Sequence, residues 1–195
     1  MDMPATWKGV EEMKVLVSYA STEGQTRKIA RHVAAHVHDT GHSVELLPLA
    51  DADDIELDRF DRVILAASIH AGHYQRALAE FATAQAGKLA GRPSLFLSVS
   101  LAAAGHDSDD WRSLERILQD FREATGWTPG QTVQVAGAYR PSQYDVFRRF
   151  VMRRILAAKD PEADPEADLE YTDWAALDRE VDAWLDSAAA GAGPA

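Results

Sequence analysis

The sequence predicts an α/β domain with a parallel sheet that is covered by helices on both faces. Three observations lead to this prediction. Short apolar segments alternate along the chain with longer segments whose apolar residues recur at helical spacing. The length of 195 residues is typical of one domain with a sizeable core. The apolar content of 46% is ordinary for a globular protein, so most of the chain is expected to fold.

The expected strands are apolar runs, the pattern of strands that are buried in a parallel sheet. They comprise residues 14–18, 43–47, 62–67, 94–100 and 132–138. A helical segment follows every strand except the second, which an acidic connection over residues 50–57 follows, so neighbouring strands are expected to be parallel. Five strands connected in this way predict the flavodoxin-like, doubly wound order 2-1-3-4-5.

The expected helices have apolar residues on one side and recognisable ends. Ile29 and Val33 are four residues apart in the first helix, and Gly41 follows it as a C-terminal glycine. Thr172 or Asp173 is suited to cap the last helix. The helices comprise residues 24–40, 73–89, 111–125, 144–158 and 174–187.

The domain is expected to span residues 13–187, with an insert at about 140–170 before the last helix. Residues 1–12 are expected to form an N-terminal extension, and residues 188–195 a flexible C-terminal tail.

The loop after the first expected strand has the composition of an anion site. Hydroxyl groups and backbone N–H groups, together with the positive end of the following helix, can hold a phosphate. The loop has one glycine and no lysine, so it is neither a Walker loop nor a dinucleotide fingerprint. It suits a phosphate monoester such as flavin mononucleotide (FMN); the alternative is a capped first helix of an ordinary α/β domain. The candidate cofactor-binding residues of this loop are Ser21, Thr22, Glu23, Gly24, Gln25 and Thr26, of which Ser21, Thr22, Gln25 and Thr26 are expected to hold the phosphate.

Two further loops are expected to meet the first loop, because ligands of such sheets bind beyond the strand ends where the strand order reverses. Gly72 allows close approach of the backbone to a flavin ring, and Tyr74 can stack on that ring. The alternative makes His73 a helix cap and Tyr74 a surface ring. The candidate ring contacts are Ser68, Ile69, His70, Ala71, Gly72, His73 and Tyr74 in one loop, and Ser100, Leu101, Ala102 and Gly105 in the other.

Composition argues against several other functions. The net charge of −11 disfavours a general nucleic-acid binder. The absence of cysteine excludes disulfides and thiolate sites. His32 and His36 are four residues apart, but Val33 stands where a metalloprotease needs a glutamate, so we expect a solvated helical face and no metal site.

The insert reverses the charge of the chain. Residues 140–159 hold six bases and one acid, whereas residues 160–186 hold eleven acids and one base. The basic part predicts an amphipathic helix that suits an anionic membrane surface or a carboxylate-bearing ligand. The alternative is a helix packed on its own domain and paired with the acids that follow. The bases that flank the apolar stripe are Arg148, Arg149, Arg153 and Arg154.

Several of these motifs together resemble one family. They are Gly24-Gln25-Thr26-Arg27, Ala67-Ser68-Ile69-His70, Gly72-His73-Tyr74, Ala136-Gly137-Ala138 and Tyr171-Thr172-Asp173-Trp174. The set resembles the flavin-dependent, menaquinone-linked protoporphyrinogen dehydrogenases, which are flavodoxin-like, over residues 14–185.

The resemblance implies noncovalent FMN, oxidation of protoporphyrinogen IX in haem biosynthesis, and electron transfer to a quinone. It implies a cytoplasmic enzyme with peripheral contact at the inner face of the cell membrane. Nucleic acid is not an expected partner. No catalytic residue is expected, because the cofactor performs the redox chemistry. The alternative is an electron-carrier flavodoxin, whose acidic surface would steer basic redox partners.

Overall fold

The computed structural model describes residues 12–143, 152, 155–157 and 160–190 of the chain. One sheet forms its centre, with strand order β2-β1-β3-β5-β6 and parallel pairing throughout this path, which confirms the predicted order. The strands are β1 (Lys14–Ala20), β2 (Ser43–Pro48), β3 (Arg62–His70), β5 (Ser94–Ser100) and β6 (Gln131–Ala136).

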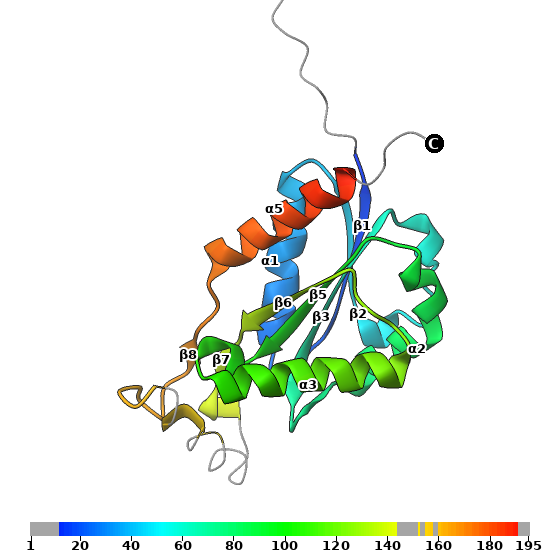
Figure 1. Ribbon diagram of the computed structural model, residues 1–195. Helices are drawn as coiled ribbons and strands as arrows, with labels where there is room; N and C mark the ends of the chain where they lie inside the picture. The colour runs from blue at the N-terminus through cyan, green and yellow to red at the C-terminus, as the bar shows by residue number, and fades with distance from the viewer. Residues whose placement is uncertain (1–11, 144–151, 153–154, 158–159, 191–195) are drawn as a thin grey trace, which may run out of the picture.

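Helices cover both faces of the sheet, with α1 and α5 on one face and α2 and α3 on the other (Figure 1). Three short 3-10 helices lie in connections, namely η1 (Leu49–Asp51), η2 (Leu57–Arg59) and η3 (Ala102–Ala104), and a fourth, η4 (Pro141–Gln143), begins the insert. The α-helices are α1 (Gln25–Asp39), α2 (Arg76–Ala90), α3 (Ser108–Thr125) and α5 (Trp174–Ala190).

Alternation along the strands builds a core on each side of the sheet. In β1, Val15 and Val17 face α1 and α5, whereas Leu16 packs with the core under α2 and α3. The core under α2 and α3 contains several aromatic rings, including those of Phe96 and Trp127, which are both fully buried. Apolar burial on both faces fixes the strand register, because a slip by one residue would exchange the two faces.

The segment after β3 differs from the predicted loop and helix. β3 runs on to His70, and β4 (His73–Tyr74) returns antiparallel to it, so α2 begins at Arg76 rather than at residue 73. Ala71 and Gly72 make the turn with φ of 48° and 83°. Two positive φ values in a two-residue turn match the twist of a hairpin, which explains why a hairpin forms there.

The last predicted strand is also divided. β6 ends at Ala136, and β7 (Ala138–Tyr139) leaves the main sheet to pair antiparallel with β8 (Leu169–Glu170). Gly137 lies between them, where an added Cβ would come within 3.2 Å of Val99 Cγ1. A glycine therefore lets the chain pass close to β5 and start the β7–β8 ribbon.

The ribbon joins the two ends of the insert. Tyr139 is fully buried against Leu156, and its hydroxyl donates to the Pro165 carbonyl at 2.9 Å. Most of the predicted helix over 144–158, with Arg148, Arg149, Arg153 and Arg154, lies outside the described residues, as do residues 1–11 and 191–195. Within the described ranges, no helix has the length and apolar character needed to span a membrane.

Arg62 at the start of β3 fastens the end of α5. Its Nη1 donates to the Leu185 carbonyl at 2.5 Å, and its guanidinium lies 5.5 Å from the Trp184 ring centroid. We expect Arg62→Met to lower the free energy of unfolding by about 2 kcal/mol, because a charge-assisted hydrogen bond from a buried side chain and the contact with the Trp184 ring are both lost. Urea denaturation measures this. The exposed pair of Arg59 with Glu45 supplies the control, and Arg59→Met is expected to cost under about 1 kcal/mol. Equal losses in the two variants would contradict the assignment.

Candidate functional site

The loop between β1 and α1 is shaped around Gly24. The Gly24 N–H donates to Ser21 Oγ at 3.1 Å, and Gly24 itself has φ of 88° as the N-cap of α1. A glycine in this position offers no side chain to cap the first turn of the helix. The first turn of α1 is therefore open to an anionic ligand, in the way that helix N-termini commonly bind phosphate.

A cavity of about 460 Å³ lies beside this loop, which is within the range of small-molecule sites. Gln25 and Thr26 are buried and do not line it. Of the six predicted cofactor-binding residues of this loop, four therefore line the cavity and two do not. The four that line the cavity are Ser21, Thr22, Glu23 and Gly24.

Gln75 joins the first loop to the hairpin, a role that sequence reasoning missed. Its Nε2 donates to Thr22 Oγ1 at 2.8 Å and to Ser68 Oγ at 3.0 Å. Ser68 Oγ lies 3.2 Å from His70 Nε2. The structure therefore brings Thr22, Ser68 and His70 together through one amide side chain at the N-cap of α2.

Tyr74 occupies the core rather than an open surface. Its ring centroid lies 5.0 Å from that of Phe96 and 5.1 Å from that of Phe121, and its hydroxyl is 2.8 Å from Ser98 Oγ. Burial raises the pKa of Tyr74 to about 12. The interpretation as a surface ring is wrong, because Tyr74 is buried. Its stacking on a flavin ring stays a prediction. Tyr74 anchors the hairpin.

The rest of the hairpin does not line the cavity beside the first loop, although Gln75, which follows it, does. Ala71, Gly72 and His73 are exposed at or beside the turn, and Ile69 and His70 are half-buried. His73 lies in β4 and does not cap α2, because the N-cap of α2 is Gln75.

The third loop is held by its own polar contacts. Ser100 Oγ accepts from the Ala103 N–H at 3.1 Å, and the Gly105 carbonyl accepts from Trp111 Nε1 at 3.0 Å. Leu101 packs with the cluster around Tyr139, so this loop is also connected to the insert. Ser100 is buried, whereas Leu101, Ala102 and Gly105 are half-buried.

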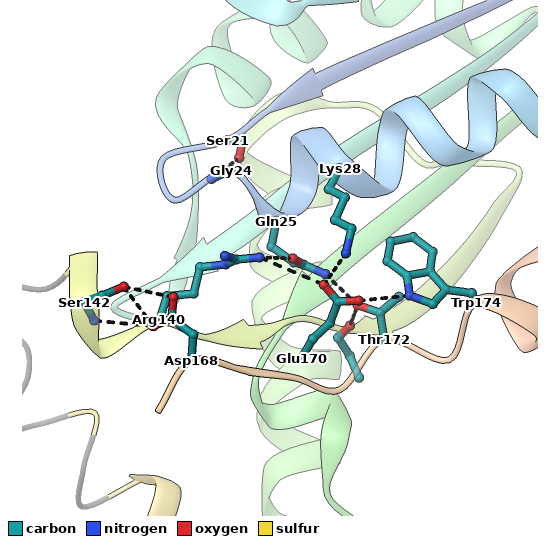
Figure 2. A network of polar contacts seen from close by, with 11 residues as sticks. Ser21, Gly24, Gln25, Lys28, Arg140, Ser142, Asp168, Glu170, Thr172 and Trp174 are labelled. Atoms are coloured by element: carbon teal, nitrogen blue, oxygen red, sulfur yellow. Dashed lines mark hydrogen bonds and ion pairs between the residues drawn. The ribbon is translucent and has the colours of Figure 1, made fainter. Parts of the chain in front are cut away.

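A polar network ties the start of α1 to the base of the insert (Figure 2). Gln25 Nε2 donates to Thr172 Oγ1 at 2.9 Å, and Thr172 Oγ1 donates to the Ala136 carbonyl at 2.7 Å. On the other side, Arg140 Nη2 donates to Gln25 Oε1 at 2.8 Å. Both ends of the Gln25 amide are thus hydrogen-bonded, which allows this side chain to be buried behind the loop between β1 and α1.

Glu170 is the acidic centre of this network. Its carboxylate accepts from Lys28 Nζ at 2.6 Å and from Trp174 Nε1 at 3.0 Å. Burial opposes its ionisation, but hydrogen bonds from Lys28, Trp174 and Gln25 outweigh burial and hold the pKa of Glu170 below its ordinary value. A charged Glu170 therefore joins α1, β8 and α5 near neutral pH.

The histidine face of α1 is packed rather than solvated, which corrects the prediction for it. His32 Nε2 lies 2.7 Å from Asp178 Oδ1, and His36 Nε2 lies 2.7 Å from Asp182 Oδ1, both on α5. Hydrogen bonds to these aspartates explain why both imidazoles are half-buried, without the need for a bound metal ion. In the part of the chain that the structure describes, no cluster of three or more His, Asp or Glu could hold a metal ion.

Comparison with known proteins agrees with this geometry. The chain is 30% identical over 162 residues to the protoporphyrinogen IX dehydrogenase (quinone) of Escherichia coli K12, covering 83% of this chain and 89% of that protein. It is 29% identical over 167 residues to the Leishmania major protein of the same name, covering 85% and 72% of the two chains. The resemblance predicted from the motifs is thereby confirmed.

Solved structures and a family model define the fold. A short-chain flavodoxin associated with a bacterial microcompartment has a TM-score of 0.57 at 14% identity, covering 90% of this chain and 99% of that one. An NADH:FMN oxidoreductase in its apo form has a TM-score of 0.53 at 18% identity, covering 90% of each chain. The sequence model of the family described as flavodoxin domain matches residues 16–166 of this chain. The chain therefore belongs to the flavodoxin domain family.

Proposed function

We propose that this protein is an FMN-dependent dehydrogenase that oxidises protoporphyrinogen IX to protoporphyrin IX and passes the electrons to a quinone. One observation carries the proposal. The uncapped first turn of α1, the hairpin after β3 and the loop after β5 lie at the same end of the sheet, and the insert is fastened to that end through Gln25 and Arg140. The similarity to two proteins named protoporphyrinogen IX dehydrogenase supports the substrate.

The residues present fit FMN. Gly24 with its positive φ leaves the first turn of α1 available for a phosphate, and Ser21 and Thr22 add hydroxyl groups at the adjoining cavity. Ile69 and Gly72 on one side, and the small residues of η3 on the other, would hold the isoalloxazine ring.

When bound, FMN supplies the acceptor for electrons from the porphyrinogen. The chain's own residues bind and orient the cofactor. Gln75 holds Thr22 and Ser68 at fixed positions, and Tyr74 keeps the hairpin fastened to the core. Because these contacts exist before any ligand arrives, little ordering remains to oppose binding. No side chain is assigned as a nucleophile or as a general acid or base.

Membrane contact is proposed for the insert, since a membrane quinone must reach the flavin. Residues Arg148, Arg149, Arg153 and Arg154 would meet anionic lipid, at roughly 1 kcal/mol each. The second candidate function is an electron carrier, which the net charge of −11 favours because acidic surfaces steer basic redox partners.

Anaerobic turnover separates the two functions. Protein loaded with FMN is mixed with protoporphyrinogen IX and a menaquinone analogue, and protoporphyrin fluorescence is followed. Quinone-dependent formation of protoporphyrin is the expected result. Failure to oxidise porphyrinogen, combined with rapid reduction by a flavodoxin reductase, would replace the enzyme with the carrier.

Thr22→Val tests the cofactor site separately. We expect the dissociation constant for FMN to rise about tenfold, because a hydroxyl group is lost while the side-chain size is kept. Titration of flavin fluorescence measures this. Thr40→Val at the far end of α1, where Thr40 Oγ1 donates to the Val37 carbonyl, is the control and should leave FMN affinity unchanged. Equal affinities in the two variants would remove Thr22 from the site.

A further inference from the structure

A second recess lies on the outer side of the phosphate loop, with a volume of about 290 Å³. It contains no hydroxyl side chain, unlike the cavity beside Ser21 and Thr22. Four cationic side chains and one carboxylate line it, in a chain whose net charge is −11. The lining residues are Glu23, Gly24, Arg27, Lys28, Arg31 and Arg140.

Helical spacing gathers three of the four cations. Arg27 and Arg31 are four residues apart on α1, with Lys28 beside them, so their side chains share one face of the helix. A Cβ built on Gly24 would lie 3.7 Å from Arg27 Nη2, which places the Arg27 guanidinium close to the phosphate loop. Both Arg27 and Arg31 are exposed, and neither forms an ion pair with another residue in the described ranges.

The fourth cation comes from the insert. Arg140 follows β7, and its guanidinium is held by Gln25 Oε1 at 2.8 Å with 25% of the side chain exposed (Figure 2). Glu170 lies 2.6 Å from Lys28 Nζ and 3.9 Å from Arg140 Nη2, so one carboxylate balances part of this charge. Glu23 also lines the recess, so four cations face two carboxylates, and the excess charge in this concave surface is positive, which favours an anionic group.

We infer that this recess binds a carboxylate of the substrate. The inference rests on the proposed function, because protoporphyrinogen IX carries two propionate groups. Arginine presents paired N–H donors that match a carboxylate, and Arg27 and Arg31 have these donors at the surface. The recess has a volume of only about 290 Å³, which suits a single substituent of a ligand rather than a lipid surface.

Paired variants test the recess on protein loaded with FMN. Arg27→Gln with Arg31→Gln removes two charges without touching the network around Gln25 and Glu170. Arg59→Gln with Lys88→Gln removes the same charge at the opposite end of the strands, because Arg59 precedes β3 and Lys88 lies in the last turn of α2. The probes are protoporphyrin IX and its dimethyl ester, with binding followed by quenching of tryptophan fluorescence.

The first double variant is expected to bind protoporphyrin IX about tenfold more weakly, with the ester and FMN bound as in the wild type. The second should match the wild type with all three ligands. If the wild type binds protoporphyrin IX and the first double variant binds it with the same affinity, the inference is overturned and the proposed function is not affected. A weaker affinity for FMN in the first variant would also overturn it, by assigning the recess to the cofactor phosphate. A wild type that binds neither porphyrin would overturn the proposed function as well.

Discussion

Replacing Gly24 by valine is expected to raise the dissociation constant for FMN by at least about 100-fold, the equivalent of two charge-assisted hydrogen bonds. A β-branched residue does not adopt the φ of 88° found at Gly24, so the loop backbone must change. The added side chain itself meets Arg27 only at an ordinary contact distance. The loss therefore comes from displaced backbone N–H groups, and titration of flavin fluorescence measures it.

Gly41 provides a matched control for this experiment. It has φ of 96°, and a Cβ added there would meet nothing within 4 Å. Gly41→Val therefore brings the same backbone strain to the other end of α1, away from the phosphate loop. Both variants should lose roughly 1–3 kcal/mol of stability, and Gly24→Val alone should lose FMN. If Gly41→Val lost FMN to the same extent, general destabilisation would explain the result.

Replacing Tyr74 by alanine is expected to lower the free energy of unfolding by about 3–5 kcal/mol. The ring packs edge-on against both Phe96 and Phe121, so its removal leaves a cavity between β5 and α3. Guanidinium denaturation measures the loss. Trp111→Ala is the control, because 37% of Trp111 is exposed and its removal should cost under about 1.5 kcal/mol. Similar losses in both variants would contradict the placement of Tyr74 in the core.

The Tyr74 hydroxyl also predicts a pH dependence. An unfolded tyrosine ionises near pH 10, whereas the pKa of folded Tyr74 is raised to about 12 by burial. The folded state holds its proton over this range and the unfolded state releases it, so the contribution of Tyr74 is complete below about pH 10. It is lost as the pH rises towards 12, by about 3 kcal/mol at most.

Tyr74→Phe isolates this effect. The variant should lose about 1 kcal/mol near pH 9 through the missing bond to Ser98, and its stability should fall less steeply towards pH 11. Tyr171→Phe is a necessary comparison, because the pKa of Tyr171 is also raised to about 12, by burial and by Asp160. A slope in Tyr74→Phe equal to that of the wild type would show that the Tyr74 hydroxyl is accessible to water.

The sheet could be predicted from the sequence because its signal is local and repeated. Each apolar run followed by a helical segment implies a parallel strand, and the strand order follows from a familiar arrangement. The hairpin was missed because a two-residue turn of this kind needs positive φ at both positions; Gly72 indicates the second, but alanine at position 71 gives no sign of its φ of 48°. The division of the last strand depends on Gly137, whose close approach to Val99 is a tertiary contact.

The candidate site was predictable in part for the same reason. Ser21, Thr22 and Gly24 lie within four consecutive residues, and their loop lies at the cavity, as the strand order predicts. Arg140 and Thr172 contact Gln25 across 115 and 147 residues of sequence, and no local pattern reveals such pairs. Gln75 was missed because a glutamine before a helix carries no signal, although here it determines the distance between two loops.

The β7–β8 ribbon has a consequence for how this protein can vary. It brings the two ends of the insert side by side, so the parent domain closes its chain regardless of what lies between them. Doubling the length of a closed loop costs only about 0.6 kcal/mol in entropy. The insert can therefore be lengthened, shortened or exchanged, by evolution or by design, while the five parallel strands of the sheet keep their pairing.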